Sequence, residues 1–244
     1  MLKKNILLQK TQSTIIVALD YSNINKAINF IKKISPNECK IKIGKEIFIS
    51  YGPYIIKKIK KMGFDIFLDL KFHDIPSTVA KAVNAAAKLG VWMINIHALG
   101  GIKMMIAAKK ELKKFKKNKP LLVAVTTLTS MNNKNLNELG INNNIKNYTI
   151  KLAKLAQKCG LDGVICSPKE IKQLRYSCGK NFILITPGIR PLNSKIYDQK
   201  RILTPLKAQQ LNVNYMVIGR PITKSINPSK TLKNIINELN KNKK

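Results

Sequence analysis

Short apolar runs of four to six residues, rich in β-branched side chains, recur along the chain and are typical of strands buried on both faces. Segments with helical periodicity lie between them, and glycine follows three of these segments, at Gly63, Gly90 and Gly160, where helix C-caps favour it. The predicted strands are residues 14–19, 40–43, 64–68, 91–96, 121–126, 163–166, 182–186 and 215–218. Helices are predicted at 24–34, 54–62, 79–89 and 148–159, and a last amphipathic helix at about 229–239.

Eight strands that alternate with helices in 244 residues favour an α/β fold of the (β/α)8 or TIM-barrel type, as a single domain over residues 1–244. The polar residues from about 237 onward are expected to form a short frayed tail. A doubly wound open sheet is the alternative. The absence of Gly-x-Gly-x-x-Gly after the first strand counts against the dinucleotide-binding version of that sheet.

The apolar content of 45% is sufficient for a large core, but no apolar run approaches the roughly 20 residues of a membrane span. Residues 1–10 contain only a three-residue apolar run, too short for a signal peptide. We therefore predict a cytoplasmic protein with no membrane partner. The four cysteines form no Cys-x-x-Cys pair, so neither a metal site nor a disulfide framework is predicted, and Cys159 and Cys166 are expected to be buried thiols.

The net charge of +33 raises the possibility of a nucleic-acid partner. The charge comes almost entirely from lysines, which are spread over the predicted helix surfaces and accompanied by abundant Asn and Ile, as in chains encoded by AT-rich codons. A solvated lysine surface is the simpler interpretation, and no specific nucleic-acid partner is predicted. Only four arginines occur, at 175, 190, 201 and 220, and lysine cannot replace the planar fork that binds phosphate through two hydrogen bonds.

Polar residues cluster at the ends of the predicted strands, the edge at which TIM barrels carry their active sites. They include Asp20, Lys42, Asp69, Lys71, His97, Thr127, Thr129, Ser167, Arg190 and Arg220. Arg190 and Arg220 follow the seventh and eighth strands beside Gly188 and Gly219, the place where many barrels bind phosphate.

The segment Asp-Leu-Lys-Phe-His-Asp-Ile-Pro at 69–76 places the cation Lys71 between the carboxylates of Asp69 and Asp74. Alternating charges at the end of a buried strand are costly unless they meet a ligand or one another. This segment is therefore the strongest candidate for a reactive site.

From Ile15 to Leu239 the chain resembles the orotidine 5'-phosphate decarboxylase family of the bacterial type 1 subfamily. The Asp-x-Lys-x-x-Asp pattern within 67–76 is highly specific to that family and its close barrel relatives. The resemblance rests on VALD at 17–20, KIGKEIF at 42–48, FLDLKFHDIP at 67–76, NIHALGG at 95–101, VTTLTSM at 125–131, TPGIRP at 186–191 and VIGRPIT at 217–223.

The resemblance implies decarboxylation of orotidine 5'-monophosphate to UMP in pyrimidine biosynthesis, with no cofactor and no metal. Lys71 would protonate C6 of the pyrimidine, within a charge network of Asp20, Lys42 and Asp69. Asp74 would reach the active site of the neighbouring subunit, so the resemblance also implies a homodimer. Asp20 and Lys42 would hold the ribose hydroxyls, Thr129 and Ser130 the base or the loop over it, and Arg190, Gln199, Gly219 and Arg220 the phosphate.

Two other functions stay open. One is a sister enzyme of the same barrel group that decarboxylates a sugar phosphate and uses magnesium, for which Glu46 could be mistaken as a ligand. The other is a catalytically inactive barrel that binds nucleic acid. His73 and His97 are interpreted as structural residues, and Leu99 and Tyr197 depart from the pattern of the family.

Overall fold

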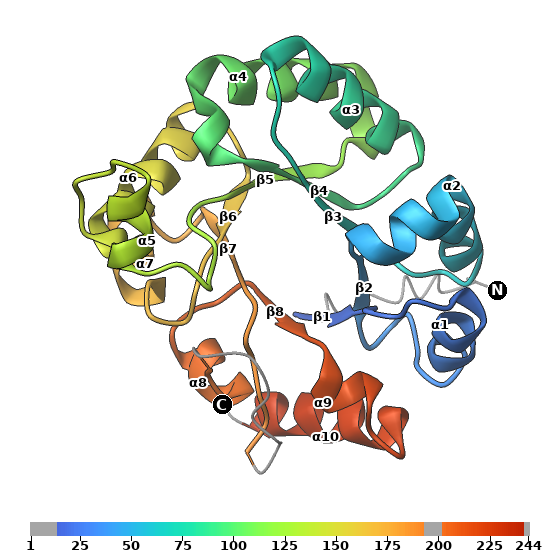
Figure 1. Cartoon of the computed structure of the whole chain (residues 1–244). Helices are drawn as coiled ribbons and strands as arrows, with labels where there is room; N and C mark the ends of the chain where they lie inside the picture. Colours follow the sequence, from blue (N-terminus) through green and yellow to red (C-terminus); the bar gives the residue numbers. More distant parts are fainter. Residues whose placement is uncertain (1–13, 193–201, 242–244) are drawn as a thin grey trace, which may run out of the picture.

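The computed structural model describes residues 14–192 and 202–241. Eight parallel strands, hydrogen-bonded in sequence order, close into one barrel as β8 pairs with β1 (Figure 1). The predicted (β/α)8 barrel is therefore confirmed. The strands are β1 (Ile15–Ala18), β2 (Lys40–Ile43), β3 (Ile66–Phe72), β4 (Met93–His97), β5 (Leu121–Val125), β6 (Gly163–Ile165), β7 (Ile183–Thr186) and β8 (Tyr215–Ile218).

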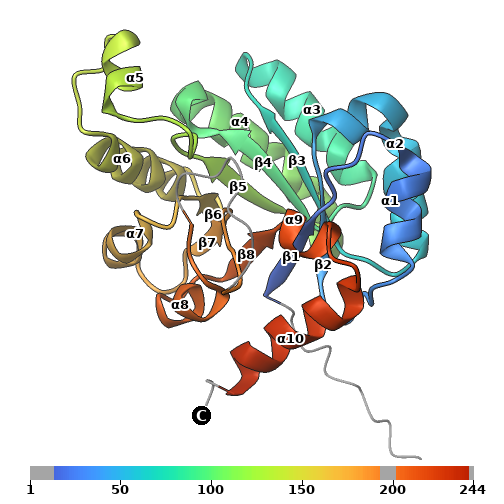
Figure 2. The ribbon, with the colours of Figure 1, turned by 60° about the horizontal axis from the view of Figure 1, so that its bottom comes forward.

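Helices form a ring outside the strands (Figure 1), and α5 stands out from this ring next to α6 (Figure 2). The helices are α1 (Ile24–Ile31), α2 (Lys45–Lys61), α3 (Pro76–Lys88), α4 (Gly101–Leu112), α5 (Asn133–Glu138), α6 (Ile145–Lys158), α7 (Ile171–Cys178), α8 (Pro205–Gln210), α9 (Arg220–Thr223) and α10 (Pro228–Lys241). Two 3-10 helices, η1 (Ala98–Gly100) and η2 (Lys113–Asn118), flank α4.

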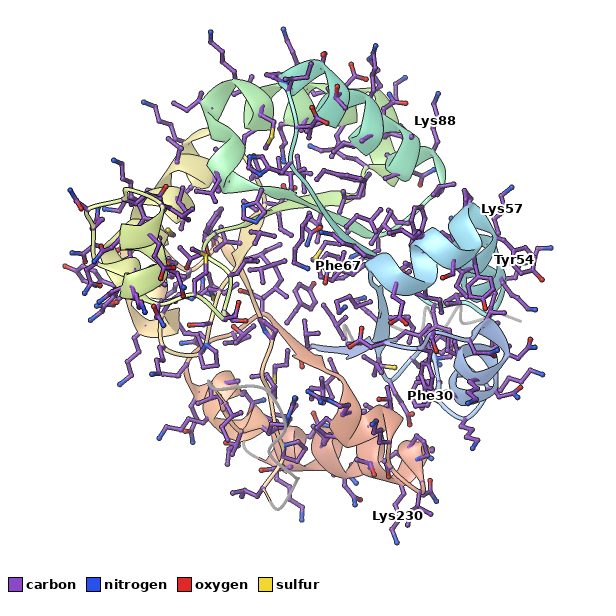
Figure 3. All side chains as sticks on the ribbon, in the orientation of Figure 1. Phe30, Tyr54, Lys57, Phe67, Lys88 and Lys230 are labelled. Atoms are coloured by element: carbon purple, nitrogen blue, oxygen red, sulfur yellow. The ribbon has the colours of Figure 1, made fainter. Side chains whose placement is uncertain are left out.

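Alternate residues of each strand face opposite sides of the barrel wall, which divides the core into two clusters. The outer cluster lies between strands and helices, and the inner one fills the barrel. Phe67 is the largest fully buried side chain and lies near the barrel axis (Figure 3). Burying one phenylalanine stabilises the fold by about 1.5 to 3 kcal/mol. The inner cluster fills the barrel beneath the strand ends.

Three boundaries differ from the sequence predictions. Strand β3 continues through Phe72, four residues beyond its apolar run. Helix α2 starts at Lys45 instead of 54, because a kink at Gly52, with φ of 53°, precedes Pro53 and interrupts the periodicity. Residues 237–241 are helical instead of frayed, since Leu239 is buried on the last turn of α10.

Buried thiols and an arginine clamp account for two other sequence features. Cys39, Cys159, Cys166 and Cys178 are all free and buried, which confirms the prediction of buried thiols at Cys159 and Cys166, and burial raises the pKa of the Cys166 thiol to about 12. The guanidinium of Arg175 donates to the carbonyls of Gly179, Lys180, Phe182 and Asn212 and to Asn214 Oδ1. Arg175, one of only four arginines in the sequence, therefore connects these loops.

The lysines Lys57, Lys88 and Lys230 point outward from the helices (Figure 3), as expected for a solvated surface.

Candidate active site

A cavity of about 250 Å³ opens at the carboxyl ends of the strands. Its apolar wall includes Phe67, Val125, Ile165, Ile185 and Val217, and polar side chains border the rest. The predicted site residues that line it are Asp20, Lys42, Asp69, Lys71, Thr129, Arg190, Gly219 and Arg220. Eight of the eleven predicted positions, drawn from six of the eight strand ends, thus meet in one cavity.

An irregular turn of the backbone in β3 presents Lys71 to this cavity. The pairing of β3 with β4 shifts register between Leu68 and Phe72, and Lys71 has a φ of 54°. A left-handed conformation costs a non-glycine residue about 1 to 2 kcal/mol. Asn95, fully buried on β4, offsets this cost because its Oδ1 accepts a 2.8 Å hydrogen bond from the Lys71 amide.

The charged side chains form one continuous chain of ion pairs across the barrel mouth. Asp69 lies at its centre, with Oδ1 2.6 Å from Lys71 Nζ and Oδ2 3.2 Å from Lys42 Nζ. Lys42 Nζ also lies 3.4 Å from Asp20 Oδ1, and Asn95 Nδ2 donates to Asp69 Oδ1 at 2.6 Å. Two carboxylates and two ammonium groups are thus held in fixed positions within one cavity.

Burial and charge act in opposite directions on the two innermost groups. Burial alone would raise the pKa of the Asp69 carboxyl, but Lys42 and Lys71 and their hydrogen bonds hold that pKa below its ordinary value. Burial alone would lower the pKa of the Lys42 ammonium, but Asp69 and Asp20 raise it above its ordinary value. Both residues therefore carry their charges at neutral pH.

The far side of the cavity is cationic. Arg190 is 6% exposed, and its backbone is fixed by Leu203, whose carbonyl accepts from the Arg190 amide at 2.8 Å. Gly188 precedes it with a φ of 79°, a conformation that suits glycine. Arg220 starts α9 directly after Gly219, and a Cβ at Gly219 would lie 3.7 Å from Asp20 Oδ2. Both arginines thus border the same space as the Asp69–Lys71 pair.

Two predicted residues lie elsewhere, and a third falls outside the described residues. Asp74 and Ser130 are exposed and do not line the cavity of their own chain. The Asp74 carboxylate accepts a 2.6 Å hydrogen bond from the Ile75 amide. Gln199, like Tyr197 and Arg201, lies outside the described residues.

Asn95 is the functional position that the sequence predictions missed. It occurs inside the apolar run of β4, where the pattern alone identifies an inward-facing strand residue. A polar amide at a fully buried strand position is uncommon and normally satisfies a specific partner, and this was the available signal.

The imidazoles of His73 and His97 stack beside Lys71, with ring centroids 5.2 Å apart and planes inclined by 25°. Burial, followed by His73, Lys71 and Lys45, lowers the pKa of His97 from 6.5 to about 4. The interpretation of both histidines as structural residues agrees with this packing.

Acidification is expected to destabilise the fold in a way that depends on His97. Its pKa is lower in the folded chain than in the unfolded one, so its contribution to stability is present above pH 6.5 and is lost as the pH falls through about 4. The free energy of unfolding, measured with urea, should fall as the pH is lowered from 7 to 4. His97→Phe should make this free energy depend less steeply on pH. The Lys57→Ala variant serves as the control, and an unchanged slope in His97→Phe would contradict the assignment.

Within residues 14–192 and 202–241, no group of three or more His, Cys, Asp and Glu side chains is arranged to hold a metal ion. No helix there is long and apolar enough to cross a membrane.

Residues 13–235 match the family described as Orotidine 5'-phosphate decarboxylase / HUMPS. The chain belongs to this family. The match to the decarboxylase / HUMPS family spans all eight strands and every described residue of the ion-pair chain.

Individual members of the family are similar over nearly the whole chain. The orotidine 5'-phosphate decarboxylase of Sodalis glossinidius is 52% identical over 231 residues, covering 95% of this chain and 92% of that protein. The orotidine 5'-phosphate decarboxylase of Shigella flexneri is 53% identical over 225 residues, covering 92% of each. The crystal structure of orotidine 5'-phosphate decarboxylase from Lactobacillus acidophilus superposes with a TM-score of 0.84 at 38% identity, covering 93% of this chain and 99% of that one.

Proposed function

We propose that the chain decarboxylates orotidine 5'-monophosphate to UMP in pyrimidine biosynthesis. The single observation that supports this most directly is the Asp20–Lys42–Asp69–Lys71 chain of ion pairs, which borders the same cavity as Arg190 and Arg220. The cavity has four cations and two carboxylates, an excess of two positive charges that suits an anionic nucleotide.

In the proposed reaction, the bond between C6 and the substrate carboxylate breaks and CO2 leaves. The electron pair stays on C6, and Lys71 Nζ transfers a proton to it; the resulting amine regains its proton from solvent. No cofactor is needed in this scheme, because the charge that develops at C6 lies next to a fixed ammonium group.

Magnitudes indicate which group matters most. Enzymes that catalyse very slow reactions lower the barrier by on the order of 20 kcal/mol. Repulsion between Asp69 and the substrate carboxylate contributes about 4 kcal/mol at a separation of roughly 4 Å and an effective dielectric of about 20. We therefore assign the larger share of the barrier reduction to stabilisation of the carbanion by Lys71. The Lys71 Nζ is held in place by Asp69 Oδ1, 2.6 Å away.

The other residues are proposed to position the substrate. Arg190, Arg220, the Gly219 backbone and Gln199 would bind the phosphate, since arginine pairs with phosphate through two parallel hydrogen bonds. Asp20 and Lys42 would bind the ribose hydroxyls, and Thr129 and Ser130 the base or the loop over it. Thr129 lines the cavity, which supports its role.

We further propose a homodimer in which Asp74 completes the site of the neighbouring subunit. Asp74 is exposed, and apolar side chains surround its segment on the surface: Ile75 is 64% exposed, Ile102 43% and Leu99 39%. Apolar residues this exposed are typical of a surface that a partner covers. A second cavity of about 260 Å³ is bordered by three lysines and three carboxylates, and provides space beside the lysines for an incoming side chain; these residues are Asp20, Lys42, Lys45, Glu46, Asp69 and Lys71.

A direct assay tests the proposed activity. Purified protein should convert orotidine 5'-monophosphate to UMP without added metal, and EDTA should leave the rate unchanged, because no step of the scheme passes through a metal. The substrate absorbance change and CO2 release measure the rate. Absence of UMP would overturn the proposal, and loss of activity in EDTA that magnesium restores would favour the sugar-phosphate alternative, to be tested with a keto-gulonate phosphate.

A further inference from the structure

We propose that His97, through its stack on His73, is a positioning residue for Asp74 and so acts on the active site of the neighbouring subunit. This inference rests on the proposed function and on the proposed homodimer. Neither histidine is among the described residues that border the two cavities, so both act through another residue.

Strand β4 supports the 69–76 segment at two points. Asn95 and His97 are two residues apart and therefore face the same side of the strand. Asn95 binds the Lys71 amide and the Asp69 carboxylate, both in the cavity of its own chain. His97 stacks on His73, the residue directly before Asp74. Asn95 therefore supports the active site of its own subunit. His97 supports the segment of Asp74, the residue proposed to enter the active site of the neighbouring subunit.

The stack is enclosed on its other side by the turn that follows β4. A Cβ at Gly100 would collide with the Met104 side chain and would lie 3.3 Å from His73 Cδ2. Glycine at this position therefore leaves room for the His73 ring next to η1. His73 is held by packing from both directions, although its own segment is exposed.

The position of Asp74 follows from the position of His73. Phe72 is the last residue of β3 that pairs with β4, opposite Ile96, and α3 begins at Pro76. Only residues 73–75 connect these two fixed points. The Asp74 carboxylate is bound to the Ile75 amide, so its direction is set by the backbone of this short connection. Removing the His97 ring would release the connection at its first residue, His73, directly before Asp74.

The groups that face His97 are cationic or uncharged. Lys71 from β3, Lys45 from the start of α2 and the ring of His73 act on it electrostatically. A neutral imidazole is compatible with this setting, whereas a protonated one would be repelled by both lysines. His97 therefore interacts with His73 by ring stacking and not through an ion pair.

Mixed dimers separate action on the partner's site from action on the subunit's own site. His97→Ala should lower kcat by about 10- to 100-fold, the range expected when a reacting group is misplaced by about 1 Å. His97→Ala mixed with inactive Lys71→Ala should regain activity, because the mixed dimer has one site with an intact Lys71 and an Asp74 from a subunit whose His97 is present. Statistical mixing places the recovery at about a quarter of the wild-type rate.

Two further mixtures make the result decisive. A mixture of Asp74→Ala with Lys71→Ala should recover activity to the same level, since Asp74 is the group proposed to cross the dimer interface. Asn95→Ala with Lys71→Ala should not recover, because Asn95 serves Lys71 of its own chain. His97→Phe keeps a stacking ring and should retain most of the wild-type kcat. Gly100→Ala, which displaces His73, should behave like His97→Ala, and it replaces that variant in the mixtures if His97→Ala does not fold.

The possible failures are distinguishable. Wild-type protein inactive on orotidine 5'-monophosphate overturns the proposed function itself. Activity without recovery in the Asp74→Ala mixture overturns the homodimer and this inference together. Recovery there, but none with His97→Ala or Gly100→Ala, overturns the inference alone and shows that the histidine stack acts on its own subunit.

Discussion

Replacing Lys71 with alanine is expected to lower kcat for decarboxylation of orotidine 5'-monophosphate by about 10⁴-fold or more while the barrel stays folded. The variant loses both the proton donor and the ammonium group that stabilises the carbanion, and each such contribution is commonly worth about 10²-fold or more. Folding should persist because the Lys71 side chain is partly exposed and Asp69 keeps Lys42 and Asn95 as partners.

The measurement is single-turnover formation of UMP, together with circular dichroism to verify the fold. Lys57→Ala removes a positive charge from the exposed face of α2 and serves as the matched control. A Lys71→Ala variant that keeps its rate within tenfold of wild type would overturn the assignment of Lys71. Equal binding of polyanions by both variants is expected, since the lysine surface does not depend on Lys71.

The barrel could be predicted from the sequence because each strand is a short, nearly continuous apolar run. Strands buried on both faces leave that pattern, and eight of them at barrel spacing restrict the fold. Prediction failed where tertiary contacts decide the backbone. Strand β3 extends through Phe72 although the charged residues Asp69 and Lys71 interrupt its apolar run, since Asn95 on the neighbouring strand stabilises the left-handed turn.

For some site residues the sequence predicted that they lie close together, but not their distances or their partners. Residues at strand ends converge by geometry, so Asp20, Lys42 and Asp69 could be grouped before their distances were known. The resemblance also implied that Asp69 and Lys71 share a charge network, but their 2.6 Å separation could not be predicted, because it depends on the irregular register of β3. Asp74 shows the limit of a single chain, because the catalytic role proposed for its exposed carboxylate would require a second copy.

Replacing Arg220 with alanine is expected to lower kcat/KM by about 10²- to 10⁴-fold, corresponding to the roughly 3 to 5 kcal/mol typical of removing one partner of a buried charge pair. Arg220 borders the cavity and is half-buried, whereas Arg190 is almost fully buried and its loss risks unfolding. Arg220→Lys should recover little, because an ammonium group cannot form the paired hydrogen bonds of a guanidinium with phosphate.

The substrate without its phosphate provides the decisive control for Arg220. Orotidine should react slowly with wild-type protein, and Arg220→Ala should react with it at nearly the same rate, because the lost interaction is made only with the phosphate. Lys230→Ala, which removes an exposed cation from α10, should leave both substrates unaffected. If Arg220→Ala reduced kcat/KM equally for orotidine and its phosphate, the residue would act on the reacting ring or on the fold. A loss confined to the phosphorylated substrate would instead mean that binding energy at the phosphate is used to lower the barrier at C6.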